Sequence, residues 1–263
     1  MSRGTAGDVV RQVANVVGAI FQVAAPIATG PAIGRISDEN STLVVPADYA
    51  FAIWTPIFLL ALIYAGYQAL PANRENQLLR RIGPFSALAF FANGTWELLF
   101  PAREFVLAQV VIVVIFAGAL AAHLLAQRGA GRGDRAERWL VAPAFGLLAG
   151  WVTAAVHVSV ATTLVAVGVF GGGPGEALVG ALLLVVAGAV ACAVILAGKD
   201  GPVQGYLAYG GAVLWAFGGV VANGASALTS GAAVFAALVV ALALFAALRR
   251  SGYGTALRAR ESS

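Results

Sequence analysis

The chain has 263 residues, of which 60% are hydrophobic and only 11% are charged. A single water-soluble domain of this length could not bury so much apolar surface, so the composition predicts a helical bundle in a lipid bilayer. The formal net charge of +4 does not indicate a nucleic-acid partner, because the basic residues lie in short loops and in the C-terminal tail without interleaved aromatic residues.

Eight stretches of the sequence are long and apolar enough to cross a bilayer, which takes about 20 residues of α-helix. The predicted fold class is therefore all-α, a polytopic transmembrane helical bundle of about eight spans. In chain order, the predicted spans are residues 9–28, 49–70, 82–100, 104–126, 139–165, 176–197, 203–222 and 228–248.

The basic residues indicate how these spans are oriented. All Lys and Arg residues except Arg35 and Arg103 lie in segments on the same side of the membrane as the N-terminus. Because Lys and Arg near span ends stay on the cytoplasmic side, both termini are predicted to be cytoplasmic and the number of spans to be even. We expect the protein in a plasma membrane of the bacterial inner-membrane type.

The first span also has features of a secretory signal peptide, because basic residues precede the apolar run and small residues follow. Gln22 and Pro26 interrupt the run and no clean A-x-A site follows, which favours a retained span.

Cys192 is the single cysteine and lies inside the sixth span, so neither a disulfide nor a cysteine metal site is expected.

The residue composition changes near residue 166, and we predict two units on this basis. Residues 1–165 form a five-helix unit whose spans carry tryptophans, prolines and polar residues. Residues 166–250 form a three-helix appendage of Ala, Val, Leu and Gly with short gaps. Residues 251–263 form a basic cytoplasmic tail, which is expected to be disordered. The longest external connection, residues 30–48, joins the first two spans.

One face of the third span carries polar and aromatic side chains together. It consists of Asn93, Trp96, Glu97 and Phe100, at positions i, i+3, i+4 and i+7 of one helical stripe. Polar side chains are costly in a membrane unless they face protein or a cavity, so this stripe is predicted to lie inside the bundle. The alternatives are that Glu97 extends toward the headgroups and Arg103, and that Trp96 is an interfacial anchor.

The fifth span presents a face of small and polar residues. The face consists of Gly146, Gly150, Thr153 and His157, while Trp151 points elsewhere. Its small residues would let another helix or a flat ligand approach closely. His157 is therefore a candidate ligand contact, and the alternative is a packing histidine bonded to a backbone carbonyl. With the predicted orientation, the outer half of the bilayer contains Gln22, Trp54, Asn93, Glu97 and His157.

No enzyme motif is recognisable in the sequence. The patterns H-x-x-x-H and G-x-S-x-G are absent, and two histidines on separate spans cannot form a zinc site without adjacent carboxylates. Glu97 and His157 could act as a general acid–base pair, but the sequence places no nucleophile beside them. We therefore assign no catalytic residue, no metal ligand and no required cofactor.

Three segments of the sequence resemble the TspO/MBR family, the tryptophan-rich sensory proteins or translocator proteins. Residues 46–58, with Phe51-Ala52-Ile53-Trp54-Thr55, are similar to the F-x-x-W-T segment that opens the second helix of the family. Residues 92–100 resemble its N-x-x-W-x-x-x-F segment on the third helix. Pro143 and residues 151–155 resemble the proline and W-V-x-x-A of the fifth helix. The three segments occur in the family's order and spacing.

The resemblance implies a bundle with a pocket under the first loop that binds flat hydrophobic molecules, such as porphyrins, other tetrapyrroles or sterols. It also allows a bound tetrapyrrole as a ligand that the fold does not require. The chain departs from the family in its three additional helices and in Ser159, where the family has an asparagine. Its first helix is poor in tryptophan and its first loop is poor in proline.

We therefore predict an integral membrane protein that binds a planar hydrophobic ligand, with a sensory or transport role. Aromatic residues would stack on the ligand and polar residues would meet its edge. The alternatives are a proton-coupled secondary transporter using Glu97 and His157, a membrane enzyme using the same pair, and a scaffold without ligand. The partners are the lipid bilayer and a small hydrophobic ligand, and a homodimer is left open. The candidate ligand-binding residues are Phe51, Trp54, Asn93, Trp96, Glu97, Trp151 and His157.

Overall fold

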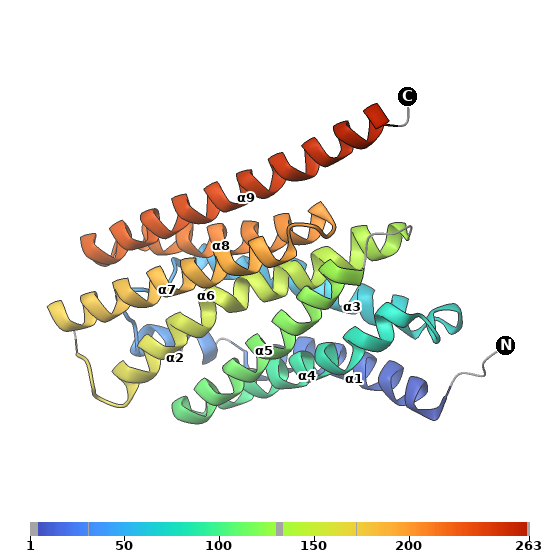
Figure 1. The fold of residues 1–263 in the computed structure, drawn as a ribbon. Helices are drawn as coiled ribbons and strands as arrows, with labels where there is room; N and C mark the ends of the chain where they lie inside the picture. The colour runs from blue at the N-terminus through green and yellow to red at the C-terminus, as the bar shows by residue number, and fades with distance from the viewer. Residues whose placement is uncertain (1–4, 31, 130–133, 172, 262–263) are drawn as a thin grey trace.

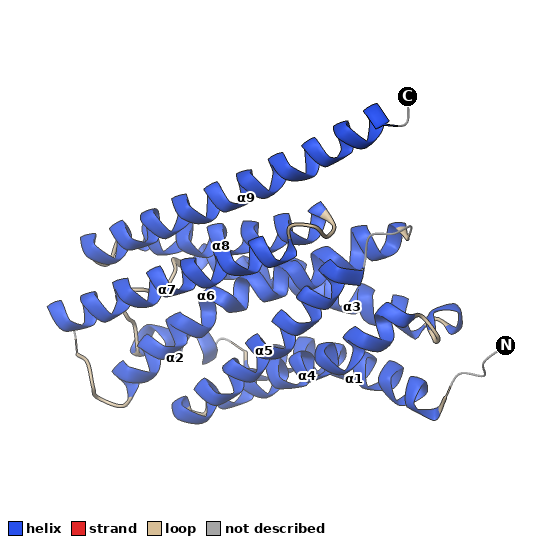
Figure 2. Ribbon diagram, viewed as in Figure 1, coloured by secondary structure: helices blue, strands red, loops and turns tan. Residues whose placement is uncertain are grey.

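The computed structural model describes residues 5–30, 32–129, 134–171 and 173–261. These residues form an all-helical bundle without a strand, as the composition predicted (Figure 2). The first helix, α1, begins at the same end of the bundle at which the last helix, α9, ends (Figure 1). This arrangement agrees with an even number of membrane crossings.

In the described part of the chain, eight long helices make up the bundle, and two of them directly follow a short turn of a different helical type. A further short turn, η2 (Pro71–Asn73), precedes α4. The long helices are α1 (Ala6–Thr29), α3 (Trp54–Ala69) after η1 (Asp48–Ile53), α4 (Gln77–Leu99), α5 (Phe105–Gly129), α6 (Ala142–Ala166) after η3 (Glu137–Val141), α7 (Pro174–Gly198), α8 (Val203–Asn223) and α9 (Ala227–Glu261).

The helix α4 differs in composition from the other long helices. Seven helices of the described chain are long and apolar enough to cross a membrane, and α4 has the length but not the apolar composition. It packs between α1 and α5, and its polar residues Ser86, Asn93 and Glu97 are buried. Because these groups are turned away from lipid, α4 can lie beside the seven apolar helices as the eighth long helix.

The helix α6 lies at the centre of the bundle. In its most apolar stretch 72% of the residues are buried, against 28% in α9. It packs closely on α8, because a Cβ atom at Gly146 would overlap the carbonyl oxygen of Gly205, and one at Gly150 would overlap that of Tyr209. Small residues allow two backbones to approach in this way inside a membrane. A close contact of α6 with α8 therefore joins the two predicted units.

A buried polar network joins α1, α3 and α4 near the end of the bundle where α1 begins. The Asn15 side chain is fully buried, and its Nδ2 donates to the Gly83 carbonyl oxygen at 2.9 Å. Arg11 Nη1 donates to Gln68 Oε1 at 3.0 Å. Buried polar groups in a membrane need such partners. These residues therefore hold the helices together, at a distance along α1 from the predicted ligand-binding region.

Two segments differ from the sequence-based expectation. The connection between the first two spans contains a short helix, α2 (Ala32–Glu39), which was not predicted. Its Ile36 packs against Phe100 and Ala108, so the helix is anchored to α4 and α5. The prediction of a disordered tail was wrong as far as Glu261, because α9 continues as one helix to that residue. Residues 262–263 lie outside the described part of the chain.

The membrane orientation can be tested with reporter fusions. We expect a cytoplasmic signal from a reporter fused after Arg128 and from one fused at the C-terminus, and an external signal from one fused after Asp38. The physical reason is the retention of Lys and Arg on the cytoplasmic side of the membrane. A cytoplasmic signal from the fusion after Asp38 would contradict the assignment of the spans.

Candidate functional site

A cavity of about 420 Å³ lies at the end of the bundle that carries α2, away from the end where α1 begins (Figure 1). It is bounded by α2, η1 and the first turn of α3 on one side, and by α4, α5 and α6 on the others. Volumes of roughly 300–1,000 Å³ are usual for small-molecule sites. Six of the seven candidate ligand-binding residues line this cavity: Phe51, Trp54, Asn93, Trp96, Glu97 and Trp151.

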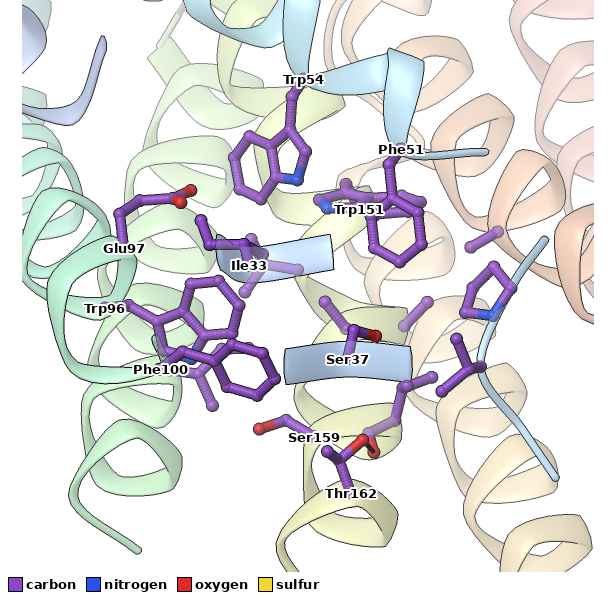
Figure 3. A pocket seen from close by; sticks show the side chains of 18 of the residues that line it. Ile33, Ser37, Phe51, Trp54, Trp96, Glu97, Phe100, Trp151, Ser159 and Thr162 are labelled. Carbon is purple, nitrogen blue, oxygen red and sulfur yellow. Dashed lines mark hydrogen bonds between the residues drawn. The ribbon is translucent and has the colours of Figure 1, made fainter. Parts of the chain in front are cut away.

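One wall of the cavity is aromatic and comes from three helical elements. The Trp54 ring stacks on Phe58 with 5.2 Å between ring centroids, one turn further along α3. Trp151 of α6 meets Trp54 edge-on at 6.2 Å and meets Phe51 of η1 at 5.8 Å. The rings of Phe51, Trp54 and Trp151 lie close together in the site (Figure 3). Each ring is held in place by its neighbour.

A second aromatic pair lies at the end of α4, apart from this wall, and consists of Trp96 and the residue that follows the helix, Phe100. Trp96 stacks on Phe100 with 4.9 Å between ring centroids and 17° between ring planes. Phe100 in turn meets Phe105 edge-on at 5.6 Å, which holds the pair against the start of α5. Figure 3 shows Ile33 of α2 in the region between the two aromatic groups. The cavity therefore has flat apolar surfaces on α4 and on the α3–α6 side.

Two buried polar residues of the cavity, Asn93 and Glu97, come from the predicted stripe on α4. Asn93 Nδ2 donates to Gln22 Oε1 of α1 at 3.3 Å. The Glu97 side chain is 4% exposed, and its carboxylate makes no hydrogen bond or ion pair with any described residue. Arg103, the predicted alternative partner, is paired with Glu39. The stripe lies inside the bundle, as the sequence analysis predicted, and Glu97 does not extend toward Arg103.

His157 lies outside this cavity, unlike the other six candidates. Its Nδ1 is 2.7 Å from the carbonyl oxygen of Thr153, and the Thr153 hydroxyl is 2.9 Å from the hydroxyl of Tyr209 on α8. The small-residue face of α6 therefore packs on α8, whereas Trp151 on another face of α6 lines the cavity. Of the two alternatives for His157, the backbone-bonded packing histidine is the one that the structure shows. His157 does not line the cavity that Glu97 lines, so this cavity does not bring the two together as an acid–base pair.

Several lining residues were missed by the sequence analysis. Ile33 and Ser37 of α2 both face the cavity and are one helical turn apart. This i, i+4 spacing was the only signal that could have identified them. Ser159, at the position where the chain departs from the TspO/MBR pattern, also lines the cavity, together with Thr162 one turn later on α6.

The cavity is covered by a segment that α8 holds in place. We call residues 43–50 the roof segment, and its Val45 and Pro46 line the cavity. Three α8 residues spaced four apart bond to its backbone. Trp215 Nε1 donates to the Ala50 carbonyl oxygen at 2.8 Å, the Gly219 carbonyl oxygen accepts from Ala47 N at 2.9 Å, and Asn223 Nδ2 donates to the Val45 carbonyl oxygen at 3.0 Å.

The last three helices thus contribute to the site. Leu43 N, at the start of the roof segment, donates to Glu176 Oε1 of α7 at 3.1 Å. Tyr49 meets the Trp215 ring edge-on at 5.3 Å, and Ala216 of α8 lines the cavity directly. Hydrogen bonds to backbone groups fix a loop that would otherwise need water as its partner. The predicted appendage therefore positions the cover of the cavity.

Comparison with known proteins gives one result that covers most of the chain. The sequence model of the family described as TSPO-like protein matches residues 9–248, which cover most of both predicted units. No curated protein and no solved structure shows a significant match. The family match, together with seven described helices that are long and apolar enough to cross a membrane, identifies the chain as an integral membrane protein. The chain belongs to the family of TSPO-like proteins.

Proposed function

We propose that the protein binds a flat, largely apolar molecule in the cavity beneath the roof segment, in the outer half of the membrane. The observation that carries this proposal is the pair of separate aromatic groups on one cavity, Trp54 with Phe51 and Trp151, and Trp96 with Phe100. Aromatic rings bind other flat rings by stacking and edge contacts in addition to the apolar area that is buried. Ligand sites are typically apolar clefts with a few polar groups, which is the composition of this cavity.

The ligand class that we propose is a fused or macrocyclic ring system, such as a tetrapyrrole or a sterol. The family membership supports a ligand-binding or transport role in the membrane. Ile33 and Ser37 of the short helix α2 also line the cavity, so α2 forms part of its boundary beside the roof segment. A sensory role and a transport role both begin with this binding step.

Substitution of Trp54 tests the proposal. We expect Trp54→Ala to weaken binding of 1-pyrenemethanol and of protoporphyrin IX dimethyl ester about tenfold or more, because stacking adds roughly 0.5–1.5 kcal/mol to the lost apolar contact. Binding is measured by the fluorescence anisotropy of the ligand, in a neutral detergent. Trp139→Ala is the control, because Trp139 is 65% exposed and does not line the cavity. Equal affinity of both variants and the native protein would refute a ligand site at this wall.

Proton-coupled transport is the second candidate function. The observation in its favour is Glu97, a buried carboxylate on the cavity with no ion-pair partner among the described residues. Such a group in a membrane protein is often part of a proton pathway. A glutamine cannot take up and release a proton, so loss of gradient-driven uptake in Glu97→Gln, with neutral ligand still bound, would favour transport. His157 is not available to the same cavity as a second relay group.

A further inference from the structure

We propose that the cavity selects ligands which carry a positive charge, and that the Glu97 carboxylate is the group that binds this charge. The inference rests on the proposed function and narrows its ligand class to flat apolar cations, such as ring compounds with a protonated amine. Flat ring compounds that carry carboxylates are excluded from this narrower class. Three observations on the charges of the cavity support it.

The first observation is the sign of the charges that line the cavity. Its ionisable residues are Asp38, Asp48 and Glu97, and the described lining contains no Lys, Arg or His. Arg35 and Arg103, the two basic residues predicted on this side of the membrane, do not cancel the negative charge of the lining. Arg103 is paired with Glu39, and Arg35 is not part of the lining. A cleft lined by charges of one sign attracts ligands of the opposite sign and repels those of the same sign.

The second observation is the state of the Glu97 carboxylate. Glu97 is 4% exposed, lines the cavity and has no hydrogen-bond or ion-pair partner among the described residues. A buried charge is costly unless a partner meets it, and the fold has already removed this carboxylate from bulk water. A cationic ligand would supply the missing partner. A ligand carboxylate in the same place would add a second unpaired negative charge.

The third observation is the arrangement of charge and aromatic rings from the mouth of the cavity to its interior. Asp38 on α2 and Asp48 on η1 are exposed, whereas Glu97 is buried. The Glu97 carboxylate points into the cavity toward the Trp54 ring (Figure 3). A cation at this position would contact both the carboxylate and an indole, and indole is the aromatic group that attracts cations most strongly. The exposed acids would favour entry of the same ligands.

The unpartnered donors near the cavity do not provide an anion site. Trp96 Nε1 and Gln22 Nε2 have no hydrogen-bond partner in the described chain, but protein atoms cover both. The Asn93 amide donates to Gln22. The hydroxyl groups of Ser159 and Thr162, which also line the cavity, carry no charge. The charged group of the described lining that is buried is therefore the Glu97 carboxylate, which binds donors and cations.

A matched set of ligands tests this selectivity. The probes 1-pyrenemethylamine, 1-pyrenemethanol and 1-pyrenecarboxylate share one ring and differ in charge. We expect the native protein to bind the amine at least about tenfold more tightly than the alcohol, and the carboxylate most weakly. Glu97→Gln should reduce the ratio of amine to alcohol affinity to near one. Glu104→Gln is the control, because it removes the same charge from an exposed position outside the cavity and should leave the ratio unchanged.

The outcomes separate this inference from the proposed function. Equal affinities of the native protein for the three probes would overturn charge selection and leave ligand binding intact. The same ratio in Glu97→Gln and the native protein would overturn the role of Glu97, provided that circular dichroism shows both to be folded. If 1-pyrenecarboxylate bound most tightly of the three probes, selection of cationic ligands would also be overturned. Failure of all three probes to bind the native protein would refute the proposed function itself.

Discussion

Replacing Gly219 with valine is expected to weaken binding of 1-pyrenemethanol about tenfold. A Cβ atom at Gly219 would lie 2.8 Å from the Cβ atoms of both Pro46 and Ala50, closer than carbon atoms approach. The branched side chain would push the roof segment away from α8 and break the bond between Ala47 N and the Gly219 carbonyl oxygen. Because Pro46 lines the cavity, this movement would open the cavity to water or lipid.

The neighbouring residue provides the control for this change. A Cβ atom at Gly218 would meet nothing within 4 Å, so Gly218→Val adds the same side chain to α8 without touching the roof segment. Anisotropy titrations of the two variants are compared with the native protein. If both variants bind as tightly as the native protein, the contact of α8 with the roof segment does not control the site.

Replacing Gly150 with valine is expected to have the largest effect on stability. A Cβ atom at this position would overlap the Tyr209 carbonyl oxygen and would lie 3.0 Å from the Ala212 Cβ, so α6 and α8 would have to separate. Overpacking of a close-packed interior costs roughly 1–3 kcal/mol, and we expect about 3 kcal/mol here because a backbone atom cannot move aside. Separation would also weaken the bond between Thr153 and Tyr209.

Thermal unfolding in detergent measures this effect. The single cysteine, Cys192, lies half-buried in α7, so a thiol-reactive fluorophore reports its exposure when the bundle opens. Gly211→Val is the control, because a Cβ atom at Gly211 of α8 would meet nothing within 4 Å. Gly150→Val should unfold at a clearly lower temperature than Gly211→Val. Equal unfolding temperatures would contradict the close packing of α6 against α8.

The stripe on α4 could be predicted because helical periodicity and the cost of polar groups in lipid agree at these positions. Asn93, Trp96 and Glu97 recur at i, i+3 and i+4, so one face must carry them, and a membrane requires that face to be inside. Helical periodicity also predicted that His157 shares a face of α6 with small residues, but it did not predict that this face packs on α8. Small residues at Gly146 and Gly150 suit a second helix as well as a ligand, and sequence periodicity cannot distinguish the two.

The roof of the cavity could not be predicted for a different reason. The bond between Trp215 and Ala50 joins residues far apart in the chain, and neither residue type indicates its partner. The helix α2 has only eight residues, too short for its i, i+4 pattern to stand out within an external connection. Similarly, the cover over Trp54 depends on tertiary contacts rather than on local sequence pattern.

Native mass spectrometry of the purified protein tests ligand binding in this cavity most directly. The native protein and Trp54→Ala are prepared in the same neutral detergent, incubated with 1-pyrenemethylamine and transferred to the gas phase. We expect one bound probe molecule per chain in the native protein, and a much smaller bound fraction in Trp54→Ala at the same probe concentration. Several weakly bound molecules per chain, in equal proportion in both proteins, would show nonspecific partition into detergent and contradict a ligand site in this cavity.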